Sequence, residues 1–253
     1  MILYVCVALT LALGALVQTV AGFGSALVAM PVLTQILGVQ VAAPVQALLG
    51  LLTTVTVLYR NWGGLRWREA SLLMAGGVLG IPLGTLALKS LPSEPVVGCL
   101  GMMLLAYAAF ALWIQPRLQM RSPFDEEKSI NAKLISWIVG FTSGVLGGAY
   151  ATDGPPLIVF GSIKRWPKET FRSILQACFL VNGIVVVTCH AMGGLITHEV
   201  LTYCCFGFPG LLGGMLLGIY LDRRVDHDRF RGLLLILIIV LGAALLGRAV
   251  FGG

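Results

Sequence analysis

The sequence has few charged residues. Asp, Glu, Lys and Arg together make up 11% of its 253 residues, whereas soluble proteins carry about 25%. Hydrophobic residues account for 58% of the chain, and its mean hydropathy is +0.93. An apolar fraction this high excludes a disordered chain. The composition instead predicts an integral membrane protein, whose surface faces the lipid bilayer.

Motifs of catalysis and of metal binding are also lacking. The six cysteines form no C-x-x-C pair and lie in apolar stretches, so we expect neither a disulfide scaffold nor a metal centre. His190 and His198 have no third ligand at metal-like spacing. No serine nucleophile motif and no P-loop is present. We therefore expect no metal, no cofactor, no catalytic residue and no enzymatic activity.

Long apolar stretches are what the sequence has in abundance. A transmembrane helix needs roughly 20 mostly apolar residues. Stretches of this kind without Lys or Arg run over 2–20, 44–59, 70–88, 95–114, 134–151, 173–189, 199–221 and 232–247. Two shorter pieces, 25–37 and 155–163, follow the first and the fifth of them. The expected fold is therefore all-α, with about eight transmembrane helices and two short broken or re-entrant half-helices.

The positive charges indicate how these segments cross the membrane. Fifteen of the 17 Lys and Arg residues fall into four clusters, within 60–68, 117–133, 164–172 and 223–231. The positive-inside rule places all four in the cytoplasm. We therefore expect a multi-pass membrane protein with both termini outside. The excess of Lys and Arg over Asp and Glu is explained by membrane topology and by contact with anionic lipid headgroups. No nucleic-acid partner is expected.

The chain contains an internal repeat. At an offset of 130, Gln46 matches Gln176, and the same offset relates a Gly-Gly-Leu motif and two further glycines: Gly63, Gly64, Leu65, Gly80 and Gly84 match Gly193, Gly194, Leu195, Gly210 and Gly214. At an offset of 124, Gly24 and Pro31 match Gly148 and Pro155. The matched loops 60–68 and 190–198 carry opposite charge patterns, which predicts two inverted repeats. The expected division is 1–114, a cytoplasmic linker 115–131, and 132–253.

Each half is expected to begin with a hairpin, over 2–37 and 134–163. The second hairpin starts and ends beside cytoplasmic clusters, and its length is too short for two crossings of about 20 residues each. We therefore expect it to bend within the bilayer. Whether the hairpins cross fully or re-enter stays open at this point.

The two hairpin bends are the candidate substrate site. They read Gly22-Phe23-Gly24-Ser25 and Gly147-Gly148-Ala149-Tyr150-Ala151-Thr152-Asp153-Gly154-Pro155. A half-helix that begins after such a break directs free N–H groups and the positive end of its dipole into a cavity, which suits an anion. Backbone opened in this way must be buried in protein or line water. The alternative is that the glycines only allow helices to pack closely.

Other polar residues in apolar stretches are further candidates. Asp153 could carry a proton coupled to transport, or could simply cap the half-helix that begins at Gly154. Gln46 and Gln176, which are repeat mates, and Asn182 could donate hydrogen bonds to an anion. The alternative for each amide is a hydrogen bond between helices.

The motifs Gly22-Phe23-Gly24-Ser25-Ala26-Leu27-Val28-Ala29-Met30-Pro31 and Gly147-Gly148 leading to Gly154-Pro155-Pro156 resemble the paired half-motifs of the TauE/SafE sulfite exporters, also called toluene-sulfonate uptake permeases. The resemblance covers nearly the whole chain. It implies an inner-membrane permease for sulfite, sulfonates or related organosulfur anions. It also implies a site that comprises Gly22, Phe23, Gly24, Pro31, Gly147, Gly148, Gly154 and Pro155.

Together these features predict a secondary transporter of a small anion, with alternating access to a midplane site. The substrate-binding set is Gly22, Phe23, Gly24, Ser25, Pro31, Gln46, Gly147, Gly148, Thr152, Gly154, Pro155, Gln176 and Asn182, with Asp153 as the candidate for proton coupling. A passive anion channel, a permease for a small carboxylate and a scaffold subunit are the alternatives.

Overall fold

The computed structural model describes residues 1–118, 130–222, 224 and 227–251, and every regular element in these residues is helical. The elements are α1 (Ile2–Ala21), α2 (Ser25–Leu37), α3 (Val39–Arg60), η1 (Trp62–Gly64), α4 (Trp67–Ser90), α5 (Ser93–Ala109), the π-helical η2 (Phe110–Ile114), α6 (Gln115–Leu118), α7 (Ile130–Tyr150), α8 (Gly154–Ile163), α9 (Lys168–Met192), α10 (His198–Leu221) and α11 (His227–Phe251).

Seven helices of the described chain are long and apolar enough to cross a membrane. They are α1, α3, α4, the continuous run from α5 to Arg117, α9, α10 and the greater part of α11. The sequence predicted about eight full spans, and seven of the described helices qualify as spans. α7 is 21 residues long but is not among them. Most of the expected linker 115–131 lies outside the described residues, although the helical run extends into it as far as Leu118.

Each half of the chain begins with a long helix followed by a short one. α1 has 20 residues and α2 has 13, while α7 has 21 and α8 has 10. At 1.5 Å per residue, α1 and α7 are each about 30 Å long, whereas α2 and α8 are about 20 Å or less. The bounds of α2 and α8 agree with the two short apolar pieces expected from sequence. Gly22 and Gly24, with φ of +84° and +100°, form the first bend, because this backbone region strongly favours glycine.

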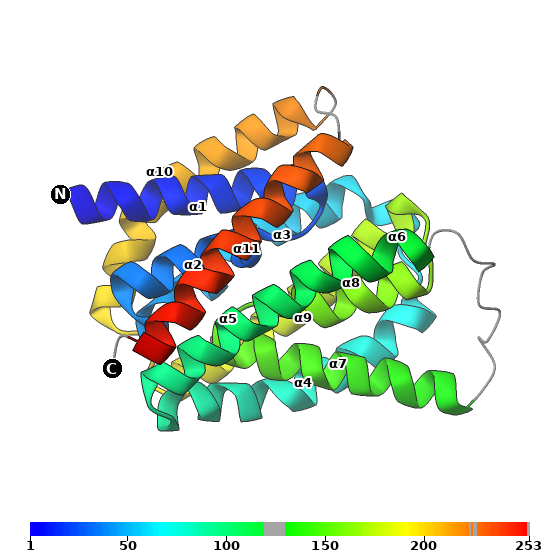
Figure 1. Ribbon diagram of the computed structural model, residues 1–253, viewed down its shortest axis with the longest axis horizontal. Helices are drawn as coiled ribbons and strands as arrows, with labels where there is room; N and C mark the ends of the chain where they lie inside the picture. The colour runs from blue at the N-terminus through cyan, green and yellow to red at the C-terminus, as the bar shows by residue number, and fades with distance from the viewer. Residues whose placement is uncertain (119–129, 223, 225–226, 252–253) are drawn as a thin grey trace.

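Two helix pairs form the outer walls of the bundle. α1 lies along α10, and α4 lies along α7, as Figure 1 shows at its upper and lower edges. Both contacts bring backbones together at glycine. Gly80 and Gly84 of α4 face carbonyl oxygens of α7, and Gly210 and Gly214 of α10 face carbonyl oxygens of α1. Small residues allow this approach between helices in lipid. These glycines are thus packing residues.

Gly214 and its neighbour Gly213 allow a direct test of this packing. A Cβ on Gly214 would overlap the carbonyl oxygen of Ala12, whereas a Cβ on Gly213 would have no neighbour within 4 Å. Overpacking costs about 1–3 kcal/mol, and so Gly214→Ala should lower the unfolding midpoint by roughly 2–12 °C. Gly213→Ala should leave it unchanged or raise it, since alanine favours helix. Equal midpoints for the two variants, measured in the same detergent, would contradict the close contact.

α9 runs through the middle of the bundle and contacts α3, α4, α7 and α8. Met1 and the last turns of α11 lie at one end of the bundle, and the helix ends that adjoin the basic clusters lie at the other (Figure 1). At that second end, Asp222 forms ion pairs with Arg60 at 3.5 Å and with Arg172 at 3.4 Å. These pairs join the ends of α3, α9 and α10.

Candidate functional site

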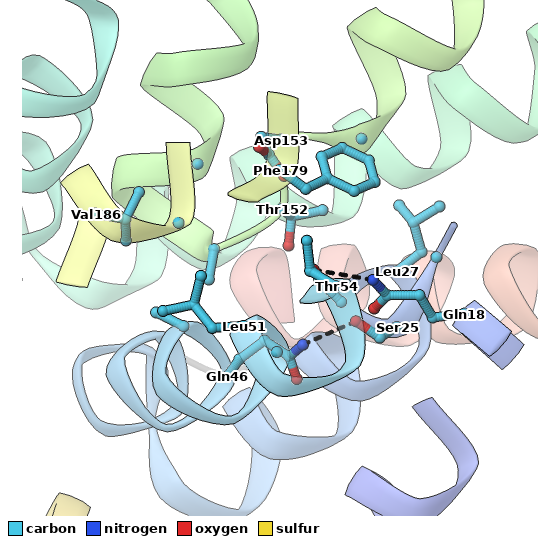
Figure 2. Close-up of a pocket in the computed structure, with 18 residues that line it drawn as sticks. Gln18, Ser25, Leu27, Gln46, Leu51, Thr54, Thr152, Asp153, Phe179 and Val186 are labelled. Carbon is cyan, nitrogen blue, oxygen red and sulfur yellow. Dashed lines mark hydrogen bonds between the residues drawn. The ribbon is translucent and has the colours of Figure 1, made fainter. Parts of the chain in front are cut away.

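A small cavity lies where the two hairpin bends meet α3 and α9. It has a volume of about 60 Å³. Figure 2 shows side chains of both halves of the chain directed toward it. Its lining residues are Gln18, Gly24, Ser25, Ala26, Leu27, Gln46, Ala47, Gly50, Leu51, Thr54, Gly147, Ala151, Thr152, Asp153, Gly154, Phe179, Gly183 and Val186.

The first turn of α2 forms one wall of this cavity. Gly24 is the N-cap, and Ser25, Ala26 and Leu27 follow it along the wall. The amide of Val28 bonds the Gly24 carbonyl at 3.3 Å, so the three amides before it precede the helical ladder. They present N–H donors and the positive end of the helix dipole, as expected for an anion site.

The start of α8 is poorer in donors than the start of α2. Gly154 lines the cavity, but Pro155 and Pro156 follow it and have no N–H group. The two helix starts are therefore unequal, although the sequence suggested equivalent ends. In this structure the amide donors come mainly from the first half of the chain.

Gln46 reaches the cavity from α3 and contacts the start of α2. Its Nε2 donates to Ser25 Oγ at 3.1 Å (Figure 2), and its side chain is buried. Its Oε1 is buried without a partner among the described residues. A buried amide oxygen without a partner costs about 1–3 kcal/mol. Half a turn of the amide would let Oε1 accept from Ser25 Oγ and would leave both N–H groups of Nε2 free to donate.

Gln18 and Thr54 form a second polar group on the wall. Gln18 Nε2 donates to Thr54 Oγ1 at 3.1 Å and lies 3.1 Å from Gln176 Oε1. Gln18 was not among the expected site residues. The signal for it was present, because it is a buried amide in an otherwise apolar stretch of α1. Gln176 itself lies behind Gln18 and outside the lining.

Among the described residues that line the cavity, Asp153 is the only Asp, Glu, Lys or Arg. It occupies the N-cap position of α8, but its side chain makes no capping hydrogen bond. Instead Asn182 Nδ2 donates to Asp153 Oδ2 at 3.0 Å, and Asn182 lies behind the carboxyl rather than in the lining. No Lys or Arg lines the cavity. The carboxyl therefore has a neutral amide, and no cation, as its partner there.

Side chains of α9 satisfy the backbone that the bends leave open. Arg172 Nη2 donates to the carbonyl of Val20, and Gln176 Nε2 donates to that of Gly22 at 2.7 Å. At the other bend, His190 Nε2 lies 2.8 Å from the carbonyl of Gly148. Unpaired backbone groups in lipid each cost several kcal/mol. α9 therefore stabilises both bends, a role that the sequence did not reveal.

The expected site residues divide into two groups. Those that line the cavity are Gly24, Ser25, Gln46, Gly147, Thr152, Asp153 and Gly154. Those that do not are Gly22, Phe23, Pro31, Gly148, Pro155, Gln176 and Asn182.

The second group packs around the bends. Arg172 lies across Gly22, and Gly148 packs against the carbonyl of Ile81 in α4. Pro31 is buried inside α2.

The offset of 124 between the bends does not describe this structure. Gly24 is the N-cap of α2, but Gly148 lies within α7, and the residue at the N-cap of α8 is Asp153. The helix starts correspond at an offset of 129, from Ser25 to Gly154. The offset of 124 was chosen because it matches Gly24 with Gly148, but in the structure Gly148 packs against α4 and does not start a helix. Pro31 and Pro155 consequently occupy different turns of their helices.

Long apolar helices around two bent hairpins, with a small polar cavity between the bends, are typical of membrane transporters. The chain belongs to the TauE/SafE sulfite exporter family, since the family described as "Sulfite exporter TauE/SafE" matches residues 6–245. It is a transporter and not an enzyme. Among curated proteins it is similar to the "Probable sulfite/organosulfonate exporter TauE" of Cupriavidus necator, with 26% identity over 211 residues that cover 81% of this chain and 78% of that protein. No solved structure matches the chain significantly.

Proposed function

We propose that this chain transports a small sulfur-containing anion, sulfite or a sulfonate, across the bacterial inner membrane, and that the cavity between the bends is its binding site. The observation that carries the proposal is a small cavity lined by amides, hydroxyls and the start of α2, with the Asp153 carboxyl beside them and no Lys or Arg in the lining. Its volume of about 60 Å³ is far below the roughly 300–1,000 Å³ of sites for drug-sized ligands. Such a site suits an anion of a few heavy atoms.

We infer that the anion is bound by neutral donors. The first-turn amides of α2 and the rotated amide of Gln46 would supply the hydrogen bonds. Gln18, Thr54 and Thr152 add polar atoms around them. Hydrogen bonds to a charged group contribute about 1.5–3 kcal/mol each. A few such bonds hold an anion without a lysine or arginine, and this leaves the anion free to dissociate on either side.

We propose that the halves 1–114 and 132–253 are inverted repeats joined by the linker 115–131, and that both termini face outside. Four contacts support the repeat: α1 on α10 is matched by α4 on α7, α3 lies on α9, and α5 lies on α11. These are the contacts that a two-fold axis in the membrane plane would generate. Rocking of one half against the other would then expose the cavity to each side in turn.

We propose that Asp153 carries the coupled proton. A charged carboxylate in the lining would repel a bound anion, and no Lys or Arg lies there to compensate. Protonation removes the repulsion, so proton and anion would bind together. The bond from Asn182 would hold the carboxyl in place in both states.

The Gln46→Leu variant tests the binding site. An anion at 100 times its dissociation constant stabilises a protein by about 2.7 kcal/mol. Sulfite or methanesulfonate should therefore raise the unfolding midpoint of the wild type, and Gln46→Leu should lose most of that shift. Gln35→Leu, at an exposed position of α2, is the matched control and should retain it.

Flux of the same anions into proteoliposomes completes this test. It should saturate for the wild type and for the control variant. If neither anion stabilised the wild type and neither was transported by it, the proposal would be wrong. Conductance that does not saturate would indicate a passive channel instead.

A further inference from the structure

An apolar groove runs beside the short helix α8. Its volume is about 710 Å³, and it shares no lining residue with the cavity between the bends. Its lining residues lie within 103–110, 135–146 and 155–164, so α8 forms the floor while α5 with η2 and α7 form the walls. α5 and α7 both contact α8 but make at most a weak contact with each other. We call this feature the α8 groove.

The walls of the α8 groove are apolar. Ile135, Ile138 and Ile163 line it, and they are between 40% and 52% exposed. The hydroxyl of Thr142, which also lines it, donates to the carbonyl of Ile138 at 2.9 Å. Lipid tails are as apolar as such side chains. The groove therefore suits an acyl chain better than a polar ligand.

The start of α8 is adapted to contact with lipid. Pro155 and Pro156 line the groove at this point. The first four N–H groups of a helix have no partner within it, and each unpaired group in lipid costs several kcal/mol. Proline has no N–H group, so two of these donors are missing from α8. The two prolines allow the helix to begin beside an acyl chain, which cannot accept a hydrogen bond.

The length of α8 corresponds to one leaflet of a bilayer. The ten residues from Gly154 to Ile163 rise about 15 Å at 1.5 Å per residue. This is half of the roughly 30 Å thickness of the hydrocarbon core. Lys164 follows the helix and belongs to one of the basic clusters. An acyl chain that begins beside Lys164 and follows α8 would therefore end near the two prolines.

Lys164 supplies a positive charge at the end of the groove. It is the only charged residue in the described lining. Its Nζ lies 5.9 Å from the centroid of the Phe160 ring, and it forms no ion pair with a described residue. Basic pockets between transmembrane helices bind the headgroups of anionic lipids. The ammonium group can therefore pair with a lipid phosphate.

We propose that the α8 groove binds one anionic phospholipid from the leaflet on the side of the basic clusters. The headgroup phosphate pairs with Lys164, and an acyl chain follows α8 as far as Pro155 and Pro156. Gly154, at the same helix start, lines the cavity between the bends. The bound lipid thus packs against the helix that bounds this cavity and stabilises the second bend. The lipid site does not depend on which anion the cavity takes.

Thermal unfolding in detergent with added lipid tests the headgroup contact. Phosphatidylglycerol should raise the unfolding midpoint of the wild type more than phosphatidylcholine with the same acyl chains does. The dependence on lipid concentration gives an apparent dissociation constant. Lys164→Gln should raise this constant for phosphatidylglycerol about fivefold, the equivalent of about 1 kcal/mol for one lysine near a membrane surface. Lys133→Gln, which removes an exposed lysine of α7 outside the lining, is the matched control and should bind as the wild type does.

Ala106→Trp tests the apolar part of the site. Ala106 is an exposed residue of α5 that lines the groove, so tryptophan there fills space without replacing a buried side chain. The variant should bind phosphatidylglycerol about tenfold more weakly, although Lys164 is still present. Ala243→Trp, at an exposed position of α11 outside the lining, is the control and should keep the affinity of the wild type.

Three results would overturn the lipid site. Equal binding of the two lipids by the wild type, or of phosphatidylglycerol by Lys164→Gln and Lys133→Gln, would exclude the headgroup contact. Equal affinity of Ala106→Trp and Ala243→Trp would exclude the groove. Stabilisation by inorganic phosphate as large as that by phosphatidylglycerol would assign Lys164 to a free anion instead. The loss of sulfite stabilisation in Gln46→Leu is measured without added lipid, and so the proposed function is tested separately.

Discussion

Asp153→Asn should uncouple anion transport from the proton gradient. The variant keeps an acceptor oxygen for Asn182, whose Nδ2 lies 3.0 Å from Asp153 Oδ2, so the second bend should keep its shape. It cannot release or take up a proton. Downhill anion flux in proteoliposomes should therefore persist. A pH gradient that drives uphill accumulation in the wild type should have roughly one-tenth of that effect in the variant, as for a coupling free energy of about 1–3 kcal/mol.

Glu94→Gln is the control for this experiment. It also removes one carboxylate, but from an exposed position at the start of α5. It should accumulate the anion as the wild type does. If Asp153→Asn responded to the pH gradient as strongly as Glu94→Gln, Asp153 would not carry the coupled proton. The N-cap position would then be its main role.

Arg172→Met should destabilise the protein strongly and abolish most transport. Arg172 is buried, pairs with Asp222 and satisfies the carbonyl of Val20 at the first bend. Removing one partner of a buried ion pair costs about 3–5 kcal/mol, which corresponds to a fall in the unfolding midpoint of roughly 6–20 °C. The first bend would also lose the donor that completes the end of α1. Thermal unfolding in detergent and anion flux measure the two effects.

Arg60→Met is the matched control, because Arg60 pairs with the same Asp222 but does not contact the bend. Its side chain is more exposed, and a pair of that kind contributes about 0–1 kcal/mol. Its unfolding midpoint and flux should remain close to those of the wild type. If both variants lost stability and flux to a similar extent, the ion pair with Asp222 would explain the effect. The contact of Arg172 with the bend would then contribute little.

Local features of the sequence were enough to predict the helices. Apolar length and flanking charge depend on neighbouring residues only, so the bounds expected for the short segments, 25–37 and 155–163, agree with α2 and α8. α7 was expected to be a full span over 134–151 and is a helix of 21 residues, but it is not among the seven candidate spans.

The candidate site was only partly predictable. Ser25, Gln46 and Asp153 could be named because polar residues in apolar stretches are costly unless they serve a purpose. The choice between Gly147 and Gly148 could not be made, since they are adjacent glycines near the end of α7. Gly147 lines the cavity, and Gly148 packs against Ile81, which lies far from it in the sequence.

By itself, then, the sequence determined the class of this protein: its apolar helices, its bent hairpins and its resemblance to the TauE/SafE family. Tertiary structure decided how the bends are stabilised. Arg172, Gln176 and His190 belong to one helix, α9, yet they reach carbonyls of two different hairpins. The physical reason is that a broken helix in lipid must find hydrogen-bond donors elsewhere in the protein. Which distant segment supplies them depends on packing, and a linear pattern of residues does not record it.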